Sequence, residues 1–184
     1  LAHGVTTVYD LGNPHYWLDP QNGLRIAQGI AQKLSEMSPG DAAYFAERLK
    51  SFQQRIADAE KRWDEQMKPY RGRKVVTYHR SWSYFARAFG LEVVDLVEPR
   101  PGIPPSPNHV QNLVTRMKQG DVKLLIMEDF FDPRLPQKIA RDTSVPLVVL
   151  PTSVGADETS KTYFDLFDRL FAGISQALNT GGKS

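Results

Sequence analysis

The longest regular pattern of apolar and polar positions in this chain runs from Asp41 to Lys68. Its apolar residues recur at steps of three and four, at Phe45, Leu49, Phe52, Ile56, Ala59, Trp63 and Met67. This spacing predicts one buried stripe along a helix. At about 1.5 Å per residue the helix would reach roughly 40 Å, which is long for a small domain. We interpret it as a spine helix that joins two lobes.

A second amphipathic helix is predicted directly before the spine helix. Asp19 supplies a carboxylate N-cap, and Pro20 suits the first helical position. The helix should continue to about Met37 and bury one apolar face, formed by Leu24, Ala27, Ile30, Ala31 and Leu34. Further upstream, the pattern indicates only a short strand around residues 5–9.

The pattern changes after Pro69, where short β-rich runs begin to alternate with helical segments. The predicted strands cover residues 75–78, 91–97, 122–127 and 147–150, and the predicted helices begin near Ser81, Pro107, Asp132 and Thr159. The third strand is almost wholly apolar, as expected when both faces of a sheet are covered. Four β-then-α units in a row predict the α/β class, with a parallel sheet wrapped by helices.

Composition narrows the function classes only in part. The chain has 184 residues, 41% of them hydrophobic, and a net charge of +2. A net charge this small does not indicate a basic surface patch, so we expect no nucleic-acid partner. The chain has no cysteine, which excludes disulfides and thiolate metal sites. No apolar run is long enough to cross a bilayer, and no signal peptide is present.

Candidate chemistry gathers where the predicted strands end. Ligands of open parallel sheets bind beyond the carboxyl ends of the strands. His79 leaves the first strand, Glu98 the second and Glu128 the third. The alternative for each glutamate is a purely local role in capping a loop or helix, and the residues alone do not decide between the two.

A second histidine, His15, lies in the rigid string Asn13-Pro14-His15-Tyr16-Trp17-Leu18-Asp19-Pro20. A lone histidine beside aromatic residues is more often a satisfied surface or core residue than a ligand. Physical reasoning alone therefore leaves its role open.

This string resembles the His-Val-Trp-Leu-Asp-Pro type motif of the cluster A-I solute-binding proteins of ABC importers, the zinc and manganese receptors. The string Val75-Val76-Thr77-Tyr78-His79, followed by Tyr84-Phe85 and Gly90-Leu91, is similar to the same family's strand, histidine turn and helix. The similarity extends over nearly the whole chain from about Gly12. The two motifs together, at this separation and with a spine helix between them, are specific.

The resemblance implies two α/β lobes with one metal ion in the cleft between them. His15 would be the ligand from the amino-terminal lobe and His79 the ligand from the carboxyl-terminal lobe, so the two histidines should face each other. Residues 1–40 would be a remnant of the first lobe, 41–68 the linking spine helix and 69–184 the second lobe. The chain is thus expected to be truncated at its amino end.

The resemblance also implies a function, partners and a location. We expect a bacterial extracytoplasmic receptor, periplasmic or lipid-anchored on the outer face of the cytoplasmic membrane, that delivers a divalent ion to an ABC permease. Histidine at position 79 favours zinc, with manganese as the alternative. We expect a monomer and no enzymatic activity.

Two ligands of the family pattern have no clear counterpart in this sequence. The family's first histidine comes from an early strand that this chain is too short to contain, and the setting of His3 does not match it. The family's aspartate after the last strand is replaced by Leu150-Pro151-Thr152-Ser153-Val154-Gly155. Asp157, Glu128 or Glu98 are candidate cleft-lining or substitute ligands, and water is another.

Two other functions stay open on the sequence. His79, Glu98 and Glu128 on one sheet edge would suit a metal-dependent hydrolase-like enzyme. Against it, the chain has no Gly-x-Ser-x-Gly elbow and no glycine-rich phosphate loop. The second alternative is an adhesin or interaction module, a role that the family's early naming implies.

Overall fold

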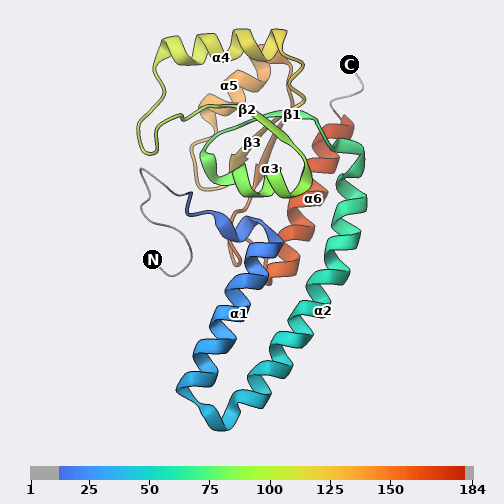
Figure 1. The fold of residues 1–184 in the computed structure, drawn as a ribbon. Helices are drawn as coiled ribbons and strands as arrows, with labels where there is room; N and C mark the ends of the chain where they lie inside the picture. Colours follow the sequence, from blue (N-terminus) through green and yellow to red (C-terminus); the bar gives the residue numbers. More distant parts are fainter. Residues whose placement is uncertain (1–12, 181–184) are drawn as a thin grey trace.

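The computed structural model describes residues 13–180. The predicted strand at residues 5–9 and His3 lie outside this range. Within it, six α-helices and four strands follow one another in chain order (Figure 1): α1 (Pro20–Met37), α2 (Ala42–Met67), β1 (Lys74–Thr77), α3 (Ser83–Phe89), β2 (Glu92–Leu96), α4 (Pro107–Gln119), β3 (Leu124–Glu128), α5 (Arg134–Thr143), β4 (Leu147–Leu150) and α6 (Tyr163–Thr180).

The four strands form one parallel sheet in the order β2-β1-β3-β4. One face of the sheet packs against α3, α6 and the second half of α2, and the other face packs against α4 and α5. All five residues of β3 are buried, as its apolar run predicts. The predicted α/β class with a parallel sheet wrapped by helices is confirmed.

Local chemistry explains where two of the helices begin. The Asp19 carboxylate accepts a hydrogen bond from the Gln21 backbone N–H at 2.9 Å, and Pro20 occupies the first position of α1. At α4, the Ser106 hydroxyl accepts from the backbone N–H of His109 at 3.2 Å, again followed by a proline at the first position. Both helix starts agree with the sequence prediction.

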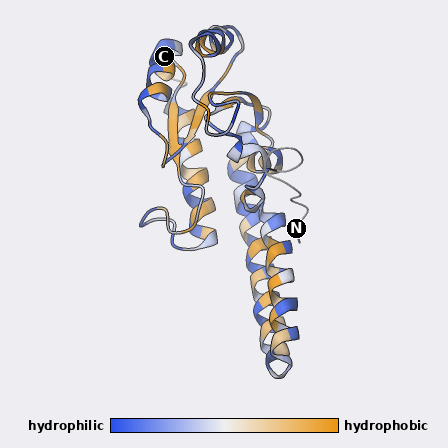
Figure 2. Cartoon of the chain, turned by 90° about the vertical axis from the view of Figure 1, so that its left-hand side faces the viewer, coloured by the Kyte–Doolittle hydropathy of each residue, from blue (hydrophilic) through white to orange (hydrophobic). Residues whose placement is uncertain are grey.

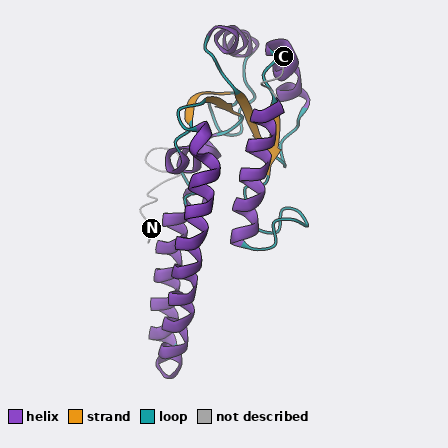
Figure 3. Cartoon of the chain, turned by 90° about the vertical axis from the view of Figure 1, so that its right-hand side faces the viewer, coloured by secondary structure: helices purple, strands orange, loops and turns teal. Residues whose placement is uncertain are grey.

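The helices α1 and α2 pack side by side as a hairpin that extends away from the sheet, while α6 packs beside the second half of α2 (Figures 1 and 3). The apolar stripe of α2 is buried only in that half, at Ile56, Ala59, Trp63 and Met67. The prediction that α1 buries its apolar face is wrong for Ile30 and Leu34, which are 55% and 39% exposed. Figure 2 shows the resulting apolar positions along the hairpin. The two stripes face each other, but the described residues supply nothing further to cover them.

No helix among residues 13–180 combines the length and the apolar character that a membrane span needs.

Candidate metal site

His79 lies two residues beyond β1, at the carboxyl edge of the sheet where the sequence predicts it. Its backbone carbonyl accepts a hydrogen bond from the Thr77 hydroxyl at 2.8 Å, which holds the turn. The ring Nδ1 lies 2.8 Å from Oε2 of Glu98. A carboxylate only accepts hydrogen bonds, so Nδ1 carries a proton, and Nε2 is the ring nitrogen left for a metal ion.

Glu98 is buried and held from two directions. Its Oε1 accepts a hydrogen bond from the Gly102 backbone N–H at 3.0 Å, while Oε2 faces His79. The Glu98 backbone N–H in turn donates to the carbonyl of Tyr78 at 2.8 Å, so the second strand's exit lies beside the first strand's exit. The structure thus brings His79 and Glu98 together, as their positions at strand ends predict.

His15 lies in the segment before α1, which is anchored on the loop after β4 and on α6. The Trp17 indole N–H donates to the carbonyl of Thr152 at 2.7 Å, and the Tyr163 hydroxyl donates to the carbonyl of Trp17 at 2.6 Å. These bonds tie the histidine segment to the loop after β4 and to the start of α6. His15 is therefore fixed relative to the sheet edge although it precedes the sheet by 59 residues.

The His15 ring is oriented by Asn13. Its Nδ1 lies 2.7 Å from the Asn13 side-chain oxygen, which can only accept, so Nδ1 carries the proton here too. Burial and then the charge of His79 lower the pKa of His15 to about 4. The ring is consequently neutral at pH 7 and has an available Nε2 lone pair.

The two imidazoles lie next to each other, with ring centroids 5.6 Å apart and planes at 77°. Two imidazoles on one tetrahedral zinc, at Zn–N distances of about 2.0–2.1 Å, would have centroids roughly 5 Å apart. The observed separation is therefore close to that of a shared ion. In each ring Nδ1 is hydrogen-bonded, which leaves Nε2 as the nitrogen that a metal would need.

Glu128, the last residue of β3, is fully buried, and neither of its carboxylate oxygens has a hydrogen-bond partner among the described residues. Burial raises its pKa, an effect that the nearby Ser81 hydroxyl and His79 offset only in part. The Ser81 hydroxyl and the Trp82 indole N–H are also buried without a partner in the described part of the chain. The sheet edge behind His79 thus holds several buried polar atoms with unused bonding capacity.

Asp157, the third candidate carboxylate, is committed to its own loop. It accepts hydrogen bonds from the Thr159 backbone N–H and hydroxyl at 2.8 and 2.7 Å and from the Ser160 hydroxyl at 2.8 Å. These bonds, those from Thr159 first, lower its pKa, and Arg169 lies 3.9 Å away. Its role as a substitute ligand stays a prediction.

Taken together, the two histidines would supply only part of a metal's coordination shell. Within residues 13–180 no group of three or more His, Asp or Glu side chains is arranged to hold a metal ion. Two imidazole nitrogens suit zinc, which usually takes four ligands, so at least two would have to come from elsewhere or from water.

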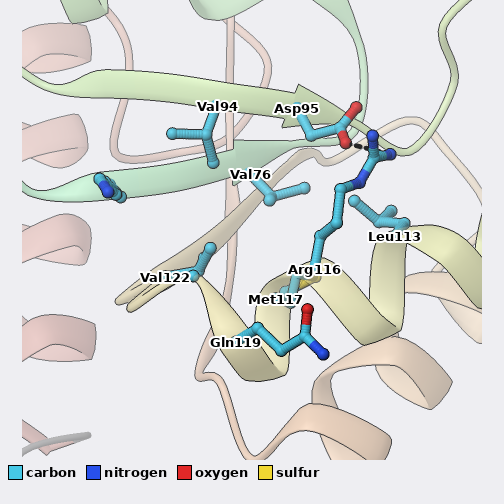
Figure 4. A pocket seen from close by; sticks show the side chains of 10 residues that line it. Val76, Val94, Asp95, Leu113, Arg116, Met117, Gln119 and Val122 are labelled. Atoms are coloured by element: carbon cyan, nitrogen blue, oxygen red, sulfur yellow. Dashed lines mark ion pairs between the residues drawn. The ribbon is translucent and has the colours of Figure 1, made fainter.

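A separate groove of about 350 Å³ lies between β2 and α4 (Figure 4). Apolar side chains such as Val94 and Met117 line it, and Arg116 pairs with Asp95 on one side. It opens on the α4 face and includes neither histidine, so it is distinct from the candidate metal site.

The sequence pattern assigns no role to Asn13 beyond its place in the string that contains His15. A signal was present, since an Asn side chain often accepts a hydrogen bond from the backbone two residues on, and here the His15 N–H donates to it at 3.0 Å. Its contact with the ring of His15 depends on side-chain geometry that spacing does not specify.

Comparison with known proteins places this geometry in a family. The model of the family "ZnuA: Zinc-uptake complex component A periplasmic" matches residues 2–177. The high-affinity zinc uptake system protein ZnuA of Brucella abortus is 26% identical over 170 residues, which cover 92% of this chain and 49% of that protein. The manganese ABC transporter substrate-binding lipoprotein PsaA of Streptococcus mitis is 25% identical, over 80% of this chain and 50% of that protein. The chain thus spans about half the length of these curated relatives.

Solved structures agree with the sequence comparison. The substrate-binding protein FpvC from Pseudomonas aeruginosa, in complex with Mn²⁺, superposes with a TM-score of 0.81 at 25% identity, over 94% of this chain and 63% of that one. These relatives are uptake and substrate-binding components, which decides against the hydrolase-like alternative. The chain belongs to the periplasmic zinc-uptake component A family, the metal-binding substrate-binding proteins of ABC transporters.

Proposed function

We propose that this chain contributes to the metal site of an extracytoplasmic receptor, which binds a divalent transition metal and delivers it to an ABC permease. The observation that carries the proposal is the pair His15 and His79. Their rings lie 5.6 Å apart, and each Nδ1 is held by a hydrogen-bond acceptor, so both Nε2 atoms are available to one ion. Zinc is the proposed cargo because imidazole nitrogen suits it better than it suits manganese.

The proposal includes a division of the chain into lobes. We propose that residues 1–40 belong to a first lobe, 41–68 to the spine helix and 69–184 to the second lobe. The apolar groove between α1 and α2, about 220 Å³ in volume, would then be covered by further chain of the first lobe. The relatives, about twice as long as this chain, have the length for such a lobe.

Release of the ion would require only local movement. His15 and His79 come from segments on either side of the spine helix, joined chiefly by hydrogen bonds to loops. Small shifts of these segments would separate the two nitrogens, while the rigid helix limits hinge closure. A periplasmic or lipid-anchored location is part of the same proposal.

Isothermal titration calorimetry with Zn²⁺ tests this assignment on the chain as it is. We expect His15→Ala and His79→Ala each to weaken zinc binding by about tenfold or more, since even the loss of groups that only support ligands costs 10–100-fold. His109→Ala is the matched control, because its ring contacts the carbonyl of Leu96 and belongs to neither candidate segment.

Unchanged affinity in both ligand variants would remove these histidines from the site. We also expect the chain to bind zinc more weakly than a site with four protein ligands, and to bind Mn²⁺ more weakly still. A chain that acted only as an adhesin or interaction module would show no rise in melting temperature with zinc.

A further inference from the structure

We propose that Asn13 is a positioning residue that couples the two candidate histidine segments; this inference rests on the proposed metal site. One side-chain amide has two functional ends, an oxygen that accepts and a nitrogen that donates. In this structure the two ends of Asn13 reach the two segments that carry His15 and His79. A single side chain thereby sets the orientation of one ring and its distance from the other segment.

The accepting end acts on His15. The Asn13 oxygen lies 2.7 Å from Nδ1 of the ring and 3.0 Å from the backbone N of the same residue. The ring bond fixes the tautomer with its proton on Nδ1, and the backbone bond closes a turn that holds the ring over the sheet edge. Groups in this relation to a metal-binding histidine orient the ring and raise its basicity.

The donating end acts on the other segment. The Asn13 side-chain nitrogen donates to the carbonyl of Arg80 at 2.7 Å, across 67 residues of sequence. Arg80 directly follows His79 and begins the short turn before α3. The amide nitrogen and oxygen of Asn13 point in different directions. When the nitrogen faces the Arg80 carbonyl the oxygen faces His15, so the two hydrogen bonds form together.

The two ends can be separated by substitution. Asn13→Ala removes both, whereas Asn13→Asp keeps an acceptor for His15 and places an oxygen against the Arg80 carbonyl, where no hydrogen bond can form. Asn22→Ala is the matched control: the Asn22 amide donates to the carbonyl of Tyr16 at 3.1 Å and so supports the segment directly after His15, without a hydrogen bond to either histidine among the described residues.

NMR of the metal-free chain at pH 7 reads both effects. The ¹⁵N shifts of the His15 ring report its tautomer, and cross-relaxation between ring protons reports the proximity of His15 and His79. We expect Asn13→Ala to alter the tautomer and weaken the cross-relaxation, Asn13→Asp to weaken only the cross-relaxation, and Asn22→Ala to leave both as in the unsubstituted chain. Asn13→Ala should also weaken Zn²⁺ binding by about 10–100-fold.

An Asn13→Ala variant with an unchanged tautomer and unchanged cross-relaxation would overturn the inference. So would an Asn22→Ala variant that reproduced both changes, because the cause would then be general loosening of the turn. These two readouts are made without metal. Failure of the proposed function, seen as zinc affinity unaffected by His15→Ala and His79→Ala, is therefore distinguishable from failure of the positioning role.

Discussion

Two regions of the molecule, which we call the lobe (the sheet with α3 to α6 and the second half of α2) and the hairpin (α1 with the first half of α2), have the same kind of amphipathic sequence but differ in how far it is buried. In the lobe, Trp63, Phe85 and Phe167 are completely buried around one another. In the hairpin, Met37 and Tyr44 are 71% and 57% exposed. Both regions have regular apolar stripes, so the difference lies in what covers the stripe and not in the stripe itself.

The helix α2 passes through both regions and makes the comparison direct. Its first half contributes Phe45 and Leu49 to an open groove shared with α1, while its second half lies under α6. Phe52 marks the transition, with its ring 5.7 Å from that of Phe164. A hydrophobic period thus identifies the face of a helix that can be buried, but only the rest of the fold determines how much of it is.

The largest expected change in the free energy of unfolding comes from a substitution in the buried second half of α2. Trp63 stacks on Phe167 at 4.8 Å between centroids, and its indole N–H donates to Asp168 at 2.6 Å. We expect Trp63→Ala to lower the free energy of unfolding by about 3–5 kcal/mol, the usual cost of removing a buried large aromatic side chain. Urea unfolding followed by circular dichroism measures this.

Tyr44→Ala, on the same helix, is the internal control. Its side chain is 57% exposed, so the change should stay within about 0.5 kcal/mol. Comparable losses in the two variants would show that the hairpin half of α2 is as well packed in solution as the lobe half, and the comparison between the two regions would break down.

Among the described residues, Glu128 is one of the buried polar groups of the lobe that lack a hydrogen-bond partner, and an intermediate effect should appear there. Burial raises the folded-state pKa of Glu128 above its ordinary value of 4.5. The folded chain then binds this proton more tightly than the unfolded chain, so stability falls as pH rises from about 4.5 through the raised pKa. We expect Glu128→Gln to stabilise the metal-free chain at pH 8 by about 1–3 kcal/mol, the range for a buried polar group without a partner.

The pH dependence is what identifies the cause. Below pH 4 the Glu128 carboxyl is protonated in both states, so the advantage of Glu128→Gln should disappear, as urea unfolding at pH 4 and pH 8 would show. Glu158→Gln, at a side chain that is 94% exposed, should change stability little at either pH. A Glu128→Gln gain of equal size at both pH values would mean that the pKa of Glu128 is the same in the folded and in the unfolded chain, against the rise that its burial causes.

Much of the fold follows from local sequence chemistry. Apolar runs and the breakers between them specify the four βα units, because each strand is short, continuous and separated from the next by a helix. The pattern predicts the start of the last helix near Thr159, whereas α6 begins four residues later, at Tyr163. A reciprocal cap gives the correct start: the Thr162 N–H donates to the Asp165 carboxylate at 2.9 Å, and the Asp165 N–H donates to the Thr162 hydroxyl at 3.2 Å.

The candidate site is predictable to a smaller degree. The strand-end rule places His79, Glu98 and Glu128 on one edge, and the structure agrees on their placement. The strand-end rule does not predict which glutamate contacts His79 and which has no partner, because the contact depends on the direction of each side chain. His15 could be assigned only through family resemblance, and the contact between Asn13 and Arg80 joins positions that no local pattern relates.

The smallest expected change in stability belongs to the open face of the hairpin. Ile30 is 55% exposed, so Ile30→Gln should alter the free energy of unfolding by less than about 0.5 kcal/mol, while reducing the binding of a hydrophobic dye. The substitution Ile139→Gln, at a fully buried position on α5, should lower the free energy of unfolding several-fold more than Ile30→Gln does.

Sedimentation velocity should show a monomer for both the unsubstituted chain and Ile30→Gln. If instead Ile30→Gln lowered stability in a way that depended on protein concentration, a second copy of the chain would be covering the groove. The exposed stripe would then be an interface between copies and no longer the contrast to the buried core of the lobe.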